Sequence, residues 1–69
     1  MGQYKIVKDI YSFMHGVKLP AVVNGKRYND YLVLVSVSEL IRIGAGEGVK
    51  SRGEDYEWSF CFGEIEEIV

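Results

Sequence analysis

Residues 21–37 read AVVNGKRYNDYLVLVSV and carry the strongest strand signals in the chain, so they decide the fold class. The dipeptide Asn24-Gly25 separates two short β-prone runs. Both central positions of a tight hairpin turn favour positive φ, which Asn and Gly tolerate. We therefore expect a hairpin that turns at Asn24-Gly25, while Asn29-Asp30 could form a second turn or a bulge.

The end of this stretch, residues 31–37, is apolar on both faces for most of its length. A strand of this kind is usually central in its sheet and covered on both sides. A helix would cover one side, and a second sheet layer or a second subunit would cover the other.

Upstream, residues 4–15 read YKIVKDIYSFMH and place apolar side chains at the three- and four-residue spacing of an amphipathic helix. A strand would instead put Lys8 and Ser12 on the same face as Ile6. Gly16 offers a C-terminal stop. The pattern predicts a helix over residues 4–15 that packs on the sheet.

Downstream, residues 38–43 read SELIRI and are ambiguous. A strand, with Ile41 and Ile43 pointing inward, is the preferred interpretation. The alternative is one helical turn, because Ser36 and Glu39 lie at capping-box spacing.

Near the C-terminus, residues 56–62 alternate aromatic with small or polar side chains, which predicts an amphipathic strand. Gly63 could mark a bulge after it. We expect residues 1–69 to form a single α+β domain, with one N-terminal helix packed on an antiparallel sheet of about four strands.

The length of 69 residues leaves little core with which to stabilise a fold. Cys61 is the one cysteine, so no intrachain disulfide can form, and with His15 as the one histidine a structural zinc site is not expected. Nine aromatic residues suit a dense core or self-association, so a homo-oligomer is expected. No pattern of catalytic, metal-binding or cofactor-binding residues is present, which predicts a protein that is not an enzyme.

The chain begins without an apolar core and cleavage site typical of a secretion signal, and its apolar runs are too short to span a bilayer. A single free cysteine fits a reducing compartment. The sequence predicts a cytoplasmic protein with no membrane partner.

The charge of the chain is unevenly distributed. Residues 54–69 hold six of the ten acids and no Lys or Arg, whereas residues 1–53 hold all eight basic residues and four acids. Because the acidic segment also contains core-forming residues, we expect it to present a fixed negative surface to a basic partner. In the alternative interpretation, Glu57, Glu64 and Glu66 protect an edge strand and pair across the sheet with Lys26, Arg27 or Arg42.

A glycine-rich segment, residues 44–53, precedes the acidic strand and reads GAGEGVKSRG. Its amides could cradle a phosphate beside Lys50 and Arg52. The Walker and dinucleotide-binding patterns are both absent, so a flexible connector is the preferred interpretation.

The sequence predicts a small binding protein that acts by protein–protein contact through the acidic C-terminal strand and the glycine-rich loop. One concrete form is a phage-type inhibitor that occludes a basic site on a nucleic-acid-handling complex. Tyr56 and Trp58 would anchor the contact if their face is exposed, and would be structural if it is core. The predicted partner-binding residues are Glu54, Asp55, Glu57, Glu64, Glu66, Glu67, Lys50, Arg52, Tyr56 and Trp58.

An alternative function uses the region from Lys26 to Tyr31. Lys26 and Arg27 lie beside Tyr28 and Tyr31, and aromatic rings next to basic residues can stack on nucleic-acid bases. This alternative is a homo-oligomeric nucleic-acid-binding module. The net charge of −2 weighs against it.

Overall fold

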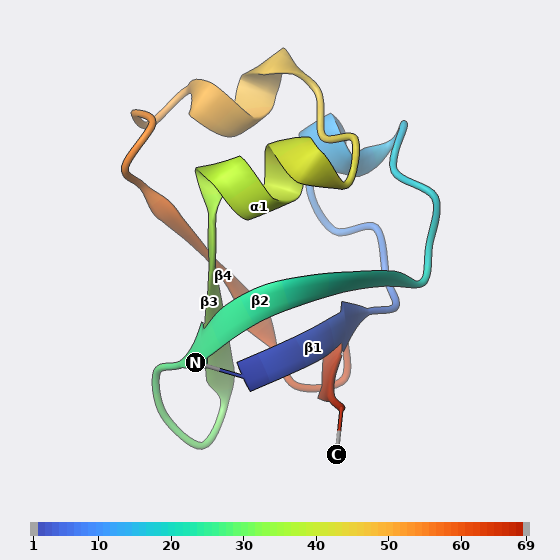
Figure 1. Cartoon of the computed structure of the whole chain (residues 1–69), viewed down its shortest axis with the longest axis vertical. Helices are drawn as coiled ribbons and strands as arrows, with labels where there is room; N and C mark the ends of the chain where they lie inside the picture. The colour runs from blue at the N-terminus through green and yellow to red at the C-terminus, as the bar shows by residue number, and fades with distance from the viewer. Residues whose placement is uncertain (1, 69) are drawn as a thin grey trace.

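Five antiparallel strands form one sheet in the computed structural model, which describes residues 2–68 (Figure 1). The strands are β1 (Gly2–Ile6), β2 (Ala21–Arg27), β3 (Leu32–Ser36), β4 (Glu57–Cys61) and β5 (Ile65–Glu67). Their order across the sheet is β4-β3-β2-β1-β5, so the last strand returns to lie beside the first.

The sheet is curled, and β2 belongs to both of its halves. Residues 21–25 of β2 pair with β1, whereas its pairing with β3 is limited to Lys26 opposite Leu34 and Arg27 opposite Val33. Figure 1 shows β3 and β4 running at a steep angle to β1 and β2. The concave side of this curl encloses the core.

The predicted N-terminal helix over residues 4–15 is wrong, and so is the predicted fold of a helix on a sheet of about four strands. The segment instead forms β1 and then a short 3₁₀ helix, η1 (Ser12–Met14). Tyr4 and Ile6 alternate inward along β1, which pairs with β2 on one side and β5 on the other. Because β1 ends at Ile6, Lys8 and Ser12 never have to share its inner face.

The predicted hairpin turn at Asn24-Gly25 is also wrong, because both residues lie inside β2. The chain turns at residues 28–31 instead, which confirms Asn29-Asp30 as a turn. A Cβ atom at Gly25 would lie 2.9 Å from Cδ1 of Tyr4 and 3.0 Å from Cγ1 of Val33. Glycine is therefore needed at this position for close packing.

After β3 the chain enters a short helix, α1 (Val37–Arg42). The preferred strand for residues 38–43 is wrong and the helical alternative is correct. Ser36 is the N-cap, and its hydroxyl accepts a hydrogen bond from the Glu39 N–H at 3.3 Å. A second 3₁₀ helix, η2 (Glu47–Lys50), follows. Together with η1, these helices cover one end of the curled sheet (Figure 1).

The predicted strand at residues 56–62 is confirmed as β4, with Trp58 and Phe60 in the core. Gly63 has φ +106° and lies in the tight turn from β4 to β5, where a bulge was the expectation. The core otherwise consists of inward side chains from every strand and from the helical connections. Its remaining members are Tyr4, Ile6, Phe13, Met14, Val17, Ala21, Val23, Val33, Val35, Val37, Leu40, Val49 and Ile65.

Candidate functional site

The six acids predicted to form one negative surface lie in two separate groups. The first group is Glu54, Asp55 and Glu57, and the second is Glu64, Glu66 and Glu67. Glu57 begins strand β4 and Glu64 follows its far end, and the five residues of the strand span about 13 Å at the rise of an extended strand. The structure therefore does not bring the six acids together.

The second group is partly used within the sheet. The Glu64 carboxylate accepts a hydrogen bond from the Cys61 N–H at 2.9 Å, inside the turn. The Glu66 carboxylate lies 3.7 Å from Nζ of Lys5, its direct neighbour on β1, and Glu67 is exposed. The cross-strand pairing considered for these acids thus occurs for Glu66, with a different lysine. An exposed pair of this kind contributes little to stability.

The first acidic group lies beside the two predicted aromatic anchors, which have different environments. Trp58 is only 9% exposed and donates its indole N–H to the Val49 carbonyl at 2.9 Å. Tyr56 is 39% exposed and packs edge-on against Trp58. The guanidinium of Arg52 lies 5.8 Å from the Tyr56 ring centre, and Lys50 is exposed. Trp58 is therefore structural, and Tyr56 alone of the two is available to a partner.

The glycine-rich segment packs on the core, although it was expected to be a flexible connector. Val49 is fully buried, and the Gly46 N–H donates to the Phe13 carbonyl at 2.8 Å. The Val49 and Ser51 amides donate to carbonyls within the segment. These amides are engaged internally, so they do not converge on a phosphate.

A different surface, the hairpin tip, consists of residues 27–31 between β2 and β3. Tyr28 is 65% exposed and Tyr31 is 75% exposed, more than any other large apolar residue among residues 2–68. In Figure 1 this loop projects away from the helical end of the molecule. The nucleic-acid alternative named these two tyrosines, which follow Lys26 and Arg27 at the end of β2.

The hairpin tip is held by side-chain hydrogen bonds. The Asn29 Oδ1 atom accepts from the Tyr31 N–H at 2.8 Å and from the Leu32 N–H at 2.9 Å. Arg27 lies 3.5 Å from the Asp30 carboxylate, and its guanidinium also lies 5.2 Å from the Phe62 ring centre. Its two tyrosines are thus displayed on a turn that the chain itself orders.

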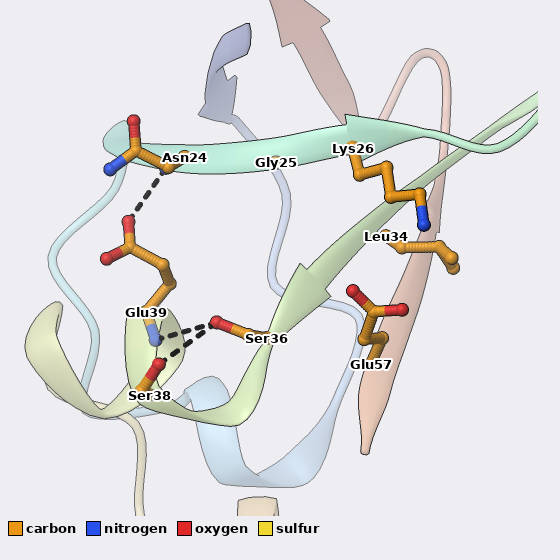
Figure 2. Close-up of a pocket in the computed structure, with 8 residues that line it drawn as sticks. All are labelled: Asn24, Gly25, Lys26, Leu34, Ser36, Ser38, Glu39 and Glu57. Atoms are coloured by element: carbon orange, nitrogen blue, oxygen red, sulfur yellow. Dashed lines mark hydrogen bonds between the residues drawn. The ribbon is translucent and has the colours of Figure 1, made fainter. Parts of the chain in front are cut away.

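A groove of about 320 Å³ opens where β2 and β3 diverge (Figure 2). Leu34 lies in it between Lys26 on β2 and Glu57 on β4. The remaining lining residues are Asn24, Gly25, Ser36, Ser38 and Glu39. Strand alternation puts Lys26, Leu34 and Glu57 on the outer face of the sheet, opposite the core.

Beyond the groove, α1 replaces the missing strand partner of β2. The Glu39 carboxylate accepts from the Asn24 N–H at 2.7 Å, and an Arg42 Nη atom donates to the Val22 carbonyl at 2.9 Å. Arg42 also donates to both Glu39 oxygens, at 2.9 and 3.1 Å. The hydrogen bonds from Arg42, and then that from Asn24, hold the pKa of Glu39 below its usual value. We call Glu39 and Arg42 the α1 clamp.

The sequence interpretation did not single out the groove as a site. Its residues come from four elements whose divergence depends on the curl of β2, and that curl has no local sequence signal. The spacing of Ser36 and Glu39 indicated where α1 could begin, but gave no sign that α1 lies beside β2.

Among residues 2–68, no group of three or more His, Cys, Asp or Glu side chains could hold a metal ion. The described helices include none with both the length and the apolar character required to cross a membrane. No family model, curated protein or solved structure matches this chain. The geometry described above is therefore the basis for proposing a function.

Proposed function

We propose that this chain is a small, non-enzymatic binding protein that docks on a partner protein through the hairpin tip. The observation that carries the proposal is the exposure of Tyr28 and Tyr31, at 65% and 75%. Tyr and Arg are enriched among the residues that dominate protein–protein affinity. A tyrosine supplies a large contact area and loses little conformational entropy on binding.

The order of the turn supports this proposal. Asn29 fixes the turn backbone through two hydrogen bonds, so little of the binding energy is needed to order the loop. Charges next to the tyrosines are nearly balanced, because Asp30 lies beside Arg27. A balanced, aromatic tip suits a protein surface better than a phosphate backbone, which favours a basic face.

Nucleic-acid binding through Lys26, Arg27, Tyr28 and Tyr31 is the second candidate. The observation in its favour is that Lys26 and Arg27, both exposed at the end of β2, directly precede the turn that carries the two tyrosines. A further prediction, that the C-terminal acids occlude a basic site on a partner complex, is untested. The division of these acids into two groups weakens the case for a single acidic contact. A cytoplasmic location is proposed on the free thiol of Cys61.

The experiment is an affinity capture of the tagged chain from a native lysate, with and without nuclease. Wild type is compared with Tyr28→Ala/Tyr31→Ala and with Glu64→Lys/Glu66→Lys/Glu67→Lys, and retained partners are then titrated. We expect a partner that survives nuclease and loses at least about 30-fold in affinity with the tyrosine variant. The acid variant should bind with less than a tenfold change.

Retention of the partner by the tyrosine variant would contradict the hairpin proposal. Loss with the acid variant alone would favour the acidic contact. Recovery that disappears with nuclease would favour the nucleic-acid module. Circular dichroism of each variant checks that the substitutions leave the fold intact, which matters most for Glu64, whose carboxylate accepts a hydrogen bond inside the turn.

A further inference from the structure

The outer face around the groove presents two opposite charges on either side of an apolar residue. Lys26 and Glu57 are both exposed, and Leu34 lies between them and is only half-buried (Figure 2). Among residues 2–68, neither Lys26 nor Glu57 has an oppositely charged group within ion-pair distance. Both charges therefore remain available to another molecule.

This arrangement is self-complementary. A two-fold rotation about an axis near Leu34 would bring Lys26 of one copy toward Glu57 of the other, and Glu57 of the first toward Lys26 of the second. In such an isologous contact every favourable pair occurs twice. We propose that the groove face, defined as Lys26, Leu34 and Glu57, is the contact between two copies of this chain.

The apolar residues of the groove face also favour a second copy of the chain as its partner. Leu32 and Leu34 point to the outer side of the sheet, where each is only partly buried. A second copy would cover them and remove apolar area from water. The gain is relevant in a chain of 69 residues, which has little core of its own. The inference is independent of the partner proposed for the hairpin tip.

Reciprocal charge reversal tests the contact. Lys26→Glu alone would face Glu57 of its twin, and Glu57→Lys alone would face Lys26, so each homodimer would hold two like-charge contacts. An equimolar mixture of the two single variants would restore both attractive pairs across a heterodimer, and so would the double variant Lys26→Glu/Glu57→Lys. A pair formed within one chain would not be restored by the mixture.

The measurement is sedimentation velocity over a concentration series reaching the submillimolar range. We expect the wild type to dimerise, and each single variant to raise the dissociation constant at least about tenfold. The mixture and the double variant should return it to within about threefold of wild type. Lys18→Glu and Glu47→Lys, on exposed residues outside the face, match the single variants in net charge and should dimerise like wild type.

Two results would overturn the proposal. One is a wild-type chain that stays monomeric throughout the series. The other is a dimer that the single reversals do not weaken, or that their mixture does not restore, since its contact would then lie elsewhere. Thermal melts of each variant separate loss of dimer from loss of fold. Neither result bears on partner capture by the hairpin tip, which Tyr28 and Tyr31 report separately.

Discussion

Gly25 lies in β2 with one Cα hydrogen directed toward the side chains of Tyr4 and Val33. A methyl group there would meet a Tyr4 carbon at 2.9 Å and a Val33 methyl at 3.0 Å. Both neighbours are in the core, where atoms are packed too closely to move aside freely. One glycine thus allows β1, β2 and β3 to share a core.

Replacing Gly25 with alanine should therefore destabilise the protein. We expect a loss of about 1 to 3 kcal/mol in the free energy of unfolding, because the overpacking cost exceeds the entropy that alanine saves in the unfolded chain. Urea denaturation followed by tryptophan fluorescence measures the change. Gly16→Ala is the matched control, since its nearest neighbour would be a carbonyl oxygen at 3.9 Å. An equal effect of the two substitutions would contradict the packing role.

Among the elements, α1 has a role that its six residues alone would not suggest. The α1 clamp supplies an acceptor for the Asn24 N–H and a donor for the Val22 carbonyl, where β2 has already diverged from β3. Two side chains thus replace part of a strand ladder. The edge that a second strand would otherwise occupy is closed within the chain.

The α1 clamp predicts a specific pH dependence. Hydrogen bonds from Arg42 and Asn24 lower the pKa of Glu39 in the folded state, so its ionised form stabilises the fold at neutral pH. That contribution is present above the pKa of the unfolded chain and is lost as the pH falls through the lower folded value. Glu39→Gln should cost about 1 kcal/mol at neutral pH, with the difference from wild type shrinking as the solution becomes acidic.

Urea midpoints of wild type and Glu39→Gln across the acidic range measure this difference. Glu67→Gln is the control, because Glu67 is exposed on β5. Its difference from wild type should stay small at every pH. A Glu39→Gln penalty that does not change with pH would contradict an ionic role for the clamp.

At the scale of the whole molecule, the small size of the chain limits how large a loss in the free energy of unfolding the fold can survive. Fully buried Phe60 lies on β4, and Tyr11 packs edge-on against its ring. A chain of 69 residues is expected to have a stability of only about 3 to 10 kcal/mol. A single large core residue therefore contributes a large part of the free energy of unfolding.

Phe60→Ala should remove about 3 to 5 kcal/mol, which lowers the melting temperature strongly and unfolds the chain if its stability lies at the low end of the expected range. Amide dispersion in a proton–nitrogen NMR spectrum, together with a thermal melt, would report the loss. Ile68→Ala, at an exposed position of the C-terminal segment, should leave the spectrum dispersed. A folded Phe60→Ala protein with an unchanged melting temperature would mean that the core is larger than the described chain, as it would be in a tightly associated oligomer.

Local patterns were sufficient to predict some parts of this molecule. The alternation of Trp58 and Phe60 with polar residues predicted β4, because a strand's two faces are set by a two-residue period. The spacing of Ser36 and Glu39 offered the helix start only as the alternative to the preferred strand, although an N-cap depends on nearby residues alone. The exposed tyrosines of the hairpin tip were also named, though for a different partner.

Other features were decided only by tertiary structure. The apolar residues of 4–15 fit the stripe of an amphipathic helix no worse than they fit β1 and η1. Pairing with β2 and β5 selects the strand. Asn24-Gly25 fits a turn equally well, and pairing with Gln3 and Gly2 of β1 selects the strand. The groove and the burial of Trp58 depend on residues far apart in the chain. Composition and local periodicity determined that this small chain is rich in strands and aromatic residues. Packing between residues far apart in the sequence determined which of its surfaces stay exposed.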